Sequence, residues 1–400
     1  MVKINPHLLK LNSNYLFQEI EKRHKKMQKH FDIAFINLGM GDATLPIPSV
    51  VTDAISSAVL ELKSEKTFRG YGPSHGELFL KKAIKENEYS NFSFTEDEIF
   101  ISNGTKTDIS AIQELFAEDS IIAISDPAYP VYVDSNVLAG RTKAFSQGTY
   151  EGLVYLPCLE ENNFLPVPPN FSCDVIYLCS PHNPTGSAFK KHELQRWVDY
   201  AKKQQAIILY DGAYESFISS SDTPRSIYEI KGAEDVAIEF RSFSKSAGFT
   251  SLRLSYYVIP KTLSSNVFSL HDLWKRRTDS RYGGTPYPIQ RGGEASFSKE
   301  GKKALKEIIF KYKQNALFLR EGLSSLGFTV FGGIDSPFIW CKTLNNLSSW
   351  DFFDYLLEKA QIITAPGVGF GLSGEGFVRF SSFPKKEFLE EGLKRLKKIV

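Results

Sequence analysis

Short apolar runs alternate with amphipathic stretches through most of the chain. Helical periodicity separates several of these runs, most clearly at 191–204. Short buried strands joined by amphipathic helices are typical of a mainly parallel, doubly wound sheet. The runs are 98–102, 121–125, 174–179, 206–210, 236–240 and 254–259. We therefore predict an α/β fold built on such a sheet.

The pattern changes after Pro286. A long helical pattern covers about 299–326, and it is followed by strand-like segments at 337–343 and 376–381 and helix-like segments at 349–360 and 385–399. We predict a large domain over 36–286 and a smaller α/β domain over 287–400. Residues 1–35 are too few to form a domain, so we expect an N-terminal arm that packs on the small domain, across the ligand site or against a partner subunit.

The composition is that of a globular protein that acts on small molecules. Hydrophobic residues make up 42% of the 400 residues and charged residues 24%, with a formal net charge of +2. Lysines and acids are interspersed, so nothing indicates a surface for nucleic acid or an anionic membrane. No run of about 18 apolar residues is present and the N-terminus lacks an apolar signal segment, which favours a soluble, cytoplasmic protein.

The four cysteines agree with a cytoplasmic location. Cys158, Cys173, Cys179 and Cys341 have neither Cys-x-x-Cys spacing nor the density of a disulfide scaffold. We therefore expect reduced thiols and neither a structural zinc site nor another bound metal.

Polar residues follow the ends of the predicted strands, which is where ligands bind in an open parallel sheet. One such segment reads Arg-Ser-Phe-Ser-Lys at 241–245, and Arg253 follows it. The Lys245 amine can form an imine with an aldehyde, and the neighbouring hydroxyl and guanidinium groups can hold a phosphate. By itself, the segment would more simply be a polar surface loop with an exposed lysine.

Two further strand ends carry residues of complementary chemistry. Residues 180–186 read Ser-Pro-His-Asn-Pro-Thr-Gly, which could also be an ordinary turn. Asp211 ends the next apolar run and is followed by Gly-Ala-Tyr at 212–214. A carboxylate at the end of a hydrophobic strand is costly unless a cation pairs with it, and a protonated pyridine nitrogen is such a cation.

An anion site and an aromatic ring are indicated at two more strand ends. Residues 102–106 read Ser-Asn-Gly-Thr-Lys and lead into helical periodicity at 108–117, which favours a bound anion or is simply a capped helix. At 126–130, Asp-Pro-Ala-Tyr-Pro places Tyr129 where its ring could stack on a planar heterocycle or pack at the rim. A single phosphorylated heterocyclic aldehyde accounts for all of these segments together.

Together with other segments, these motifs match one known protein family over nearly the whole chain. The chain resembles the fold-type I pyridoxal-5'-phosphate (PLP)-dependent aminotransferases, and within them the diaminopimelate group. Asn-Pro-Thr-Gly at 183–186 and Ser-Phe-Ser-Lys at 242–245 mark the broad class, whereas Tyr-Leu-Phe at 15–17 and Gly-Tyr-Gly-Pro at 70–73 point to that group. The remaining matches include Asn14 and the segments 39–42, 102–106, 126–129, 364–370 and 378–381.

The resemblance implies PLP as the cofactor and a role for each matching residue. Lys245 is expected to carry PLP as a Schiff base, Asp211 to pair with the pyridine nitrogen, and Asn183 and Tyr214 to hold the phenolic oxygen. Tyr129 is expected to stack on the ring. The phosphate and nearby cofactor contacts fall to Thr105, Lys106, Ser242, Ser244 and Arg253, with Tyr71 reaching over from the other subunit of a homodimer. Substrate contacts fall to Arg379, which would grip the α-carboxylate, and to Tyr15, Gly41, Lys106 and Asn183.

Three positions depart from the pattern of the diaminopimelate group. That group usually has an acid, which helps to hold the distal ammonium of the substrate, where this chain has Ser74. Its asparagine near 283 is Gly283 here, and the residue before Asn183 is His182 rather than a second asparagine. Loss of a charged contact of this kind costs on the order of 1.5–3 kcal/mol of substrate discrimination.

The expected reaction moves an amino group from an amino acid to a 2-oxo acid, with LL-diaminopimelate and 2-oxoglutarate as the leading pair, in lysine biosynthesis. Lys245 would serve as both tether and general base. The alternatives are the same reaction with an aromatic, lysine-like or glutamate donor, and a PLP lyase or racemase on the same scaffold. A PLP-fold regulator is disfavoured, because the N-terminal arm is too short for a DNA-binding domain.

Overall fold

The computed structural model describes residues 2–11, 15–31, 33–265 and 267–400, so Asn14 of the N-terminal motif lies outside the described residues. The helices are α1 (Leu16–Gln28), α2 (Ser49–Glu61), α3 (Leu78–Glu88), α4 (Thr105–Ala111), α5 (Val131–Leu138), α6 (Lys191–Gln204), α7 (Phe243–Ser246), α8 (Leu270–Arg281), α9 (Tyr287–Ser296), α10 (Lys299–Ser325), α11 (Ser349–Ala360) and α12 (Lys386–Leu396). The longer strands are β2 (Ile99–Ser102), β3 (Ile122–Asp126), β6 (Leu153–Pro157), β7 (Val175–Cys179), β8 (Ile207–Asp211), β9 (Ala237–Ser242), β10 (Ser255–Val258), β13 (Val330–Gly332), β14 (Phe338–Lys342) and β17 (Phe377–Ser381). Two-residue strands are β1 (Ile36–Asn37), β4 (Phe145–Ser146), β5 (Thr149–Tyr150), β11 (Ser264–Ser265), β12 (Phe268–Ser269), β15 (Ile362–Ile363) and β16 (Ala365–Pro366).

Seven strands form the central sheet, in the order β2-β10-β9-β8-β7-β3-β6. The strands from β9 to β6 run parallel, and β10 runs antiparallel to both of its neighbours. All six strands predicted from the apolar runs are present in this sheet. The predicted α/β fold with a mainly parallel sheet is therefore confirmed.

The seventh strand, β6, was not predicted. It lies at the edge of the sheet and pairs with β3 alone. Leu153 and Leu156 of its five residues are buried, Val154 and Tyr155 are partly buried and Pro157 is exposed. Its short apolar run, Leu-Val-Tyr-Leu, was not assigned to a strand from the sequence.

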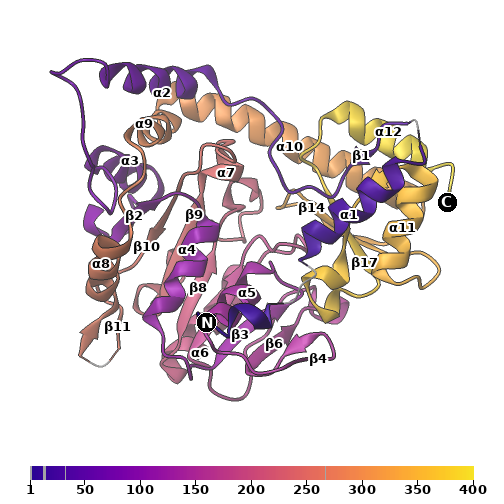
Figure 1. The fold of residues 1–400 in the computed structure, drawn as a ribbon, viewed down its shortest axis with the longest axis horizontal. Coiled ribbons are helices and arrows are strands. Elements are labelled where there is room, and N and C mark those ends of the chain that lie inside the picture. Colours follow the sequence, from indigo (N-terminus) through magenta and orange to yellow (C-terminus); the bar gives the residue numbers. More distant parts are fainter. Residues whose placement is uncertain (1, 12–14, 32, 266) are drawn as a thin grey trace.

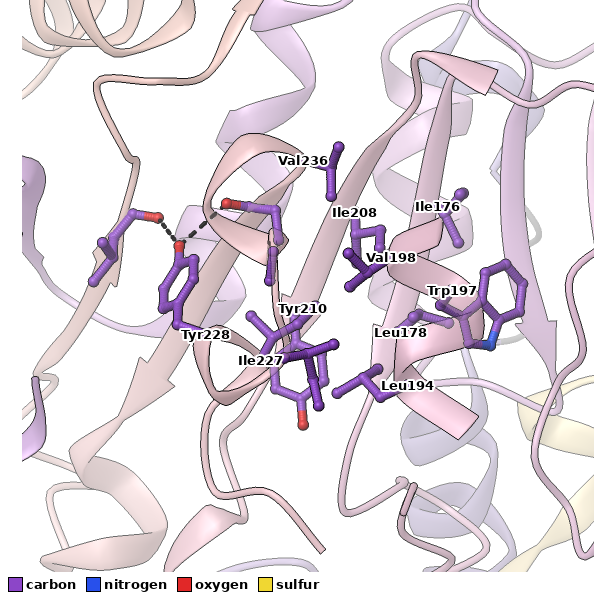
Figure 2. Packing of buried hydrophobic residues seen from close by; sticks show 14 of the residues in the cluster. Ile176, Leu178, Leu194, Trp197, Val198, Ile208, Tyr210, Ile227, Tyr228 and Val236 are labelled. Carbon is purple, nitrogen blue, oxygen red and sulfur yellow. Dashed lines mark hydrogen bonds between the residues drawn. The ribbon is translucent and has the colours of Figure 1, made fainter. Parts of the chain in front are cut away.

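Helix α6 shows how the helices cover the sheet. Its bounds are those predicted from periodicity, and its apolar face turns Leu194, Trp197 and Val198 toward Ile176 of β7 and Ile208 of β8 (Figure 2). All five side chains are at most 1% exposed. Burying an aliphatic side chain of this kind stabilises a fold by about 1.5–3 kcal/mol, so this face fixes the helix against the strands.

A second sheet of four strands, in the order β13-β14-β17-β16, lies in the C-terminal part of the chain. Helices α10, α11 and α12 pack with it around a separate apolar cluster. Figure 1 shows α10 running from α9, beside the large sheet, to α12 beside the small one. The helical and strand-like segments predicted after Pro286 are confirmed, with α10, α11, α12, β14 and β17 at the expected positions.

The N-terminal part of the chain also lies against this C-terminal part. Strand β1 pairs in parallel with β15, and Arg23 of α1 forms an ion pair with Asp354 of α11. Among the described residues, no helix combines the length and apolar character needed to cross a bilayer.

Helix α4 differs from its prediction, which placed the helical pattern at 108–117. The α-helix begins at Thr105, because the Gly104 carbonyl already accepts hydrogen bonds from the N–H groups of Thr107 and Asp108, at 2.8 and 3.3 Å. It gives way to a 3-10 turn at Ile112–Leu115. No side chain caps its N-terminus among the described residues, so Thr105 and Lys106 stand in the first turn with unpaired backbone donors.

Candidate active site

One cavity of about 510 Å³ brings the predicted site residues together. It is bounded by the carboxyl ends of β3, β7, β8 and β9 and by residues of β14 and β17. Every predicted site residue except Tyr71 lines it, namely Tyr15, Gly41, Thr105, Lys106, Tyr129, Asn183, Asp211, Tyr214, Ser242, Ser244, Lys245, Arg253 and Arg379. The residues predicted from strand ends therefore lie around one cavity, and Tyr15, Gly41 and Arg379, which only the family resemblance indicated, line it too.

Lys245 lies in the short helix α7, directly after β9. Its Nζ donates a hydrogen bond of 2.5 Å to the carbonyl oxygen of Gly41. Burial lowers the pKa of the amine to about 8, with Asp42 opposing the shift and two nearby arginines adding to it. A lysine with this pKa is partly neutral near pH 7, so it can act as a nucleophile or as a base.

Asp211 ends β8 and is 7% exposed. Its carboxylate accepts hydrogen bonds from the Tyr132 hydroxyl at 2.6 Å and from the Ala213 N–H at 3.1 Å. Burial raises the pKa of the carboxyl, and these two hydrogen bonds oppose that effect. No cationic side chain of the described residues contributes to the shift. A buried acid of this kind lacks the positive partner that it needs, and a ligand with a protonated ring nitrogen would supply one.

Arg379 of β17 also lines the cavity and is 2% exposed. Its Nη1 and Nη2 donate to Asn183 Oδ1 at 2.6 Å and to the Gly39 carbonyl at 2.7 Å. The guanidinium lies 4.3 Å from the centre of the Phe338 ring, and its buried Nε has no hydrogen-bond partner among the described residues. Burial lowers the pKa of the guanidinium to about 10, so the charge is kept at neutral pH. The N–H groups that remain can bind a carboxylate.

A second set of residues at the cavity offers anion-binding groups, and we call it the anion cradle: Gly104–Lys106, Ser242, Ser244 and Arg253. Arg253 donates to Ser244 Oγ at 3.4 Å, and the Ser244 N–H donates to Ser242 Oγ at 3.1 Å. Gly104 has φ +133°, and a Cβ there would lie 2.0 Å from Arg253 Nη2. Only glycine lets the backbone and the guanidinium approach this closely.

Thr105 and Lys106 enter the cradle in different ways. The Thr105 hydroxyl donates to the Arg241 carbonyl at 3.1 Å, which leaves its backbone N–H as the donor to a ligand. Lys106 Nζ donates to the Tyr15 hydroxyl at 3.4 Å. The arm residue Tyr15 is thereby joined to the cradle, as expected for the wall of the site.

Tyr71 is the predicted residue that the cavity does not include. Its side chain is 100% exposed, and it borders a separate surface hollow of about 490 Å³ together with Gly283. Gly283 has no side chain and offers only backbone groups here, as the sequence suggested. A Cβ added at this position would meet nothing within 4 Å, so space does not require a glycine.

Ser74 lies beside a carboxylate from another element. Its hydroxyl donates to Asp279 Oδ1 of α8 at 2.5 Å, and His75 Nε2 lies 3.0 Å from the same oxygen. The Ser74 hydrogen bond, with His75 and nearby cations, lowers the pKa of Asp279. An ionised acid therefore stands next to the position where the sequence comparison found serine in place of an acid.

His182 is a buried structural residue. Its Nδ1 and Nε2 lie 2.7 Å from Thr185 Oγ1 and 3.3 Å from Ser125 Oγ. Burial lowers the pKa of the imidazole to about 3, so the ring is neutral. It packs behind Asn183 and does not line the cavity.

Several residues that line the cavity were not predicted as site residues, and three of them contact or face predicted ones: Asp42, Tyr132 and Phe338. Asp42 belongs to the matching segment 39–42, and its negative charge raises the pKa of Lys245, against the effect of burial. Tyr132 lies in the first turn of α5, three residues after Tyr129, which precedes the helix. Phe338 carries no signal in the sequence, because only the fold brings β14 to this site.

Within the described residues, no group of three or more His, Cys, Asp or Glu side chains could hold a metal ion. The four cysteines are free and buried.

Known proteins are similar to this chain in sequence and fold over almost their whole length. LL-diaminopimelate aminotransferases from Methanosphaera stadtmanae and Agathobacter rectalis are 47% and 46% identical, covering 100% of this chain and 99% and 100% of their own. The solved L,L-diaminopimelate aminotransferase from Chlamydomonas reinhardtii superposes with a TM-score of 0.95 at 40% identity, covering 100% of this chain and 98% of that one. The family model "Aminotransferase class I and II" matches residues 33–396, so the chain belongs to this family of PLP-dependent enzymes.

Proposed function

We propose that this aminotransferase holds PLP in the cavity around Lys245 and exchanges an amino group between LL-diaminopimelate and a 2-oxo acid, with 2-oxoglutarate as the leading acceptor. The observation that carries the proposal is that one cavity holds Lys245, Asp211 and Arg379. Among the described residues, the Asp211 carboxylate has no cationic partner and Arg379 Nε has no hydrogen-bond partner. The printed names of the full-length relatives support the substrate.

The residues present fit PLP at both ends. Asp211 has the place and charge to pair with a protonated ring nitrogen, and the anion cradle offers N–H, hydroxyl and guanidinium donors to a phosphate. Tyr129 lines the same cavity and could stack on the ring. The side-chain oxygen of Asn183 accepts a hydrogen bond from Arg379. Its side-chain N–H groups therefore remain free to donate to the phenolic oxygen of PLP, together with the Tyr214 hydroxyl. When bound, PLP supplies an aldehyde for amines and a ring that accepts electrons.

The protein's own groups then position the substrate and move its proton. Arg379 would hold the α-carboxylate, stacked against Phe338. Lys245, with its lowered pKa, would both anchor the cofactor and carry a proton away from the substrate Cα. Tyr132 keeps the Asp211 carboxylate in one orientation through its 2.6 Å hydrogen bond, so the charge facing the ring nitrogen is fixed before the substrate arrives.

We further propose a homodimer in which Tyr71 reaches the neighbouring site. A fully exposed tyrosine is unusual unless a partner covers it, and large exposed side chains surround it in the sequence at Val59, Leu60, Phe68 and Leu78. A cytoplasmic location is proposed as well, since free buried cysteines fit a reducing compartment.

Asp279 is proposed to supply the negative charge for the distal ammonium of LL-diaminopimelate. Ser74 donates a hydrogen bond to its carboxylate, and Gly283 follows four residues later, beyond the C-terminal end of α8. Asp279→Asn should lower kcat/KM for LL-diaminopimelate about 10- to 100-fold while leaving that for glutamate within about twofold. An equal loss for both donors would mean that Asp279 has no role in specificity.

The substrate proposal is tested with a panel of amino donors. Purified holoenzyme is mixed with LL-diaminopimelate, glutamate, lysine or phenylalanine, and the change of the bound cofactor from its aldehyde to its amine absorbance is followed. LL-diaminopimelate should react with the highest kcat/KM. A higher value for one of the other donors would replace it as the substrate, and the alternative of a different amino donor would then hold.

A further inference from the structure

A buried acid that the proposed reaction does not use lies directly beneath the anion cradle. Asp108, in the first turn of α4, is 4% exposed. Ser102 Oγ donates to its Oδ1, and Ser255 Oγ donates to its Oδ2 at 2.7 Å. The two serines are register partners at the ends of β2 and β10. Two strand ends and a helix are therefore joined through one carboxylate.

This network continues into the cradle. Ser255 Oγ accepts a 2.9 Å hydrogen bond from the Gly104 N–H. Gly104 is the residue against which the Arg253 guanidinium lies, since a Cβ at this position would be 2.0 Å from Arg253 Nη2. Asp108 is thereby connected through Ser255 and Gly104 to the arginine that would bind the phosphate.

The surroundings of Asp108 set its charge. Arg253 and Arg277 favour the carboxylate, as do the two serine hydroxyls, whereas burial raises the pKa to about 7. The hydroxyls of Tyr257 and Tyr282 also face it, and their own ionisation is made harder by its charge. Asp108 is therefore poised to gain or lose a proton near neutral pH when a charge beside it changes.

We propose that Asp108 is a positioning residue of the anion cradle: its carboxylate holds Gly104 through Ser255 while the cradle is empty, and it takes up one proton from solvent when a phosphate enters. This inference rests on the proposed function, because it requires the phosphate of PLP to bind at Arg253. A dianion and a buried carboxylate that share one arginine repel each other, and protonation of the acid removes the repulsion.

The direction of the pH effect follows from linkage. Because binding takes up a proton, the affinity for a dianion falls as pH rises above the pKa of the empty cradle. The Asp108→Asn side chain has a similar shape but no charge, so it should bind a dianion more tightly than aspartate at high pH. A purely structural role for Asp108 predicts the opposite, namely weaker binding by the variant at every pH.

The test uses sulfate, a dianion that does not titrate between pH 6.5 and 8.5, and cofactor-free protein carrying Lys245→Met, so that the amine does not contribute. Calorimetry in two buffers of different ionisation enthalpy measures both the dissociation constant and the proton uptake. The parent protein should take up a proton and lose about tenfold in affinity between pH 6.5 and 8.5. The Asp108→Asn protein should change less than twofold and bind more tightly at pH 8.5.

Absence of proton uptake by the parent protein would overturn the role of Asp108, and this reading needs no folded Asp108 variant. An added Arg253→Met change separates the two proposals. If Arg253→Met abolishes sulfate binding but the affinity of the parent protein does not depend on pH, the cofactor site stands and the inference about Asp108 is wrong. If sulfate binding is unaffected by Arg253→Met, the anion cradle itself is wrong and the proposed function falls with it.

Discussion

Asp211 is the residue whose charge defines what the cavity can bind. Its carboxylate is buried, is held by Tyr132 and Ala213, and has no cationic partner among the described residues. Asp211→Asn keeps the shape but loses the charge that would stabilise a protonated ring nitrogen. We expect a folded protein that retains PLP, with the rate of the first half-reaction lowered by a factor on the order of 10²–10³ or more.

Stopped-flow spectroscopy of a single turnover measures this rate. Tyr132→Phe is the matched control, because it removes one hydrogen bond to Asp211 but keeps the charge, and it should cost about tenfold or less. A rate near that of the wild type in Asp211→Asn would make Asp211 a structural residue.

Lys245 should titrate far below an ordinary lysine. Its folded pKa is lowered by burial to about 8, so the neutral, reactive amine appears as pH rises through about 8. Labelling of cofactor-free protein with an amine-directed reagent, read out peptide by peptide, should show this midpoint at Lys245. The exposed Lys359, whose pKa is raised above its ordinary value by its hydrogen bond to Glu358, serves as the control and should become reactive only at clearly higher pH. Equal midpoints for the two lysines would contradict the buried amine.

Site residues could be predicted from the sequence where they directly follow a predicted strand. Lys245, Asp211 and Asn183 each follow an apolar run, and the fold confirms that such ends meet. Phe338 and Asp279 could not be found in this way, because their positions depend on how the second sheet and α8 pack against the first. The roles assigned to the cavity residues remain predictions until they are measured.

At the scale of elements, periodicity was most informative where one face is fully buried. Helix α6 and the parallel strands have continuous or regularly spaced apolar positions, so their bounds could be read within a residue or two. The edge strand β6 and the start of α4 were missed. The apolar run in β6 is only four residues long, is partly buried and ends at Pro157, and the start of α4 is set by the backbone conformation of Gly104 rather than by a capping side chain.

The packing of α6 gives a stability prediction. Trp197 is 1% exposed and packs between the helix and the strands β7 and β8 (Figure 2). Trp197→Ala should lower the free energy of unfolding by about 3–5 kcal/mol, since the side chain leaves a cavity that its neighbours fill only in part. Urea unfolding followed by circular dichroism measures the loss. Phe310→Ala, at a position 58% exposed on α10, is the control and should cost well under half as much.

For the whole molecule, the proposed homodimer with shared sites makes a mixing experiment decisive. Tyr71→Ala and Lys245→Ala chains should each have low activity alone. After co-refolding in equal amounts, half of the dimers are mixed, and each mixed dimer has one site with both native residues. Activity should therefore recover to about a quarter of the wild-type value. Mixtures no more active than the Tyr71→Ala protein would place Tyr71 and Lys245 in the same chain's site or show that Tyr71 has no role.

The central claim is that Lys245 anchors PLP in this cavity of an aminotransferase that uses LL-diaminopimelate. The most direct measurement follows a single half-reaction of the holoenzyme, first with the amino donor alone and then after a 2-oxo acid is added. A separate sample of holoenzyme is reduced with borohydride before any donor is added. LL-diaminopimelate should convert one equivalent of cofactor per chain from its aldehyde to its amine form, 2-oxoglutarate should reverse the change, and reduction beforehand should fix the cofactor on Lys245. A reduced adduct on another lysine, or no conversion by LL-diaminopimelate where another donor converts the cofactor fully, would contradict it.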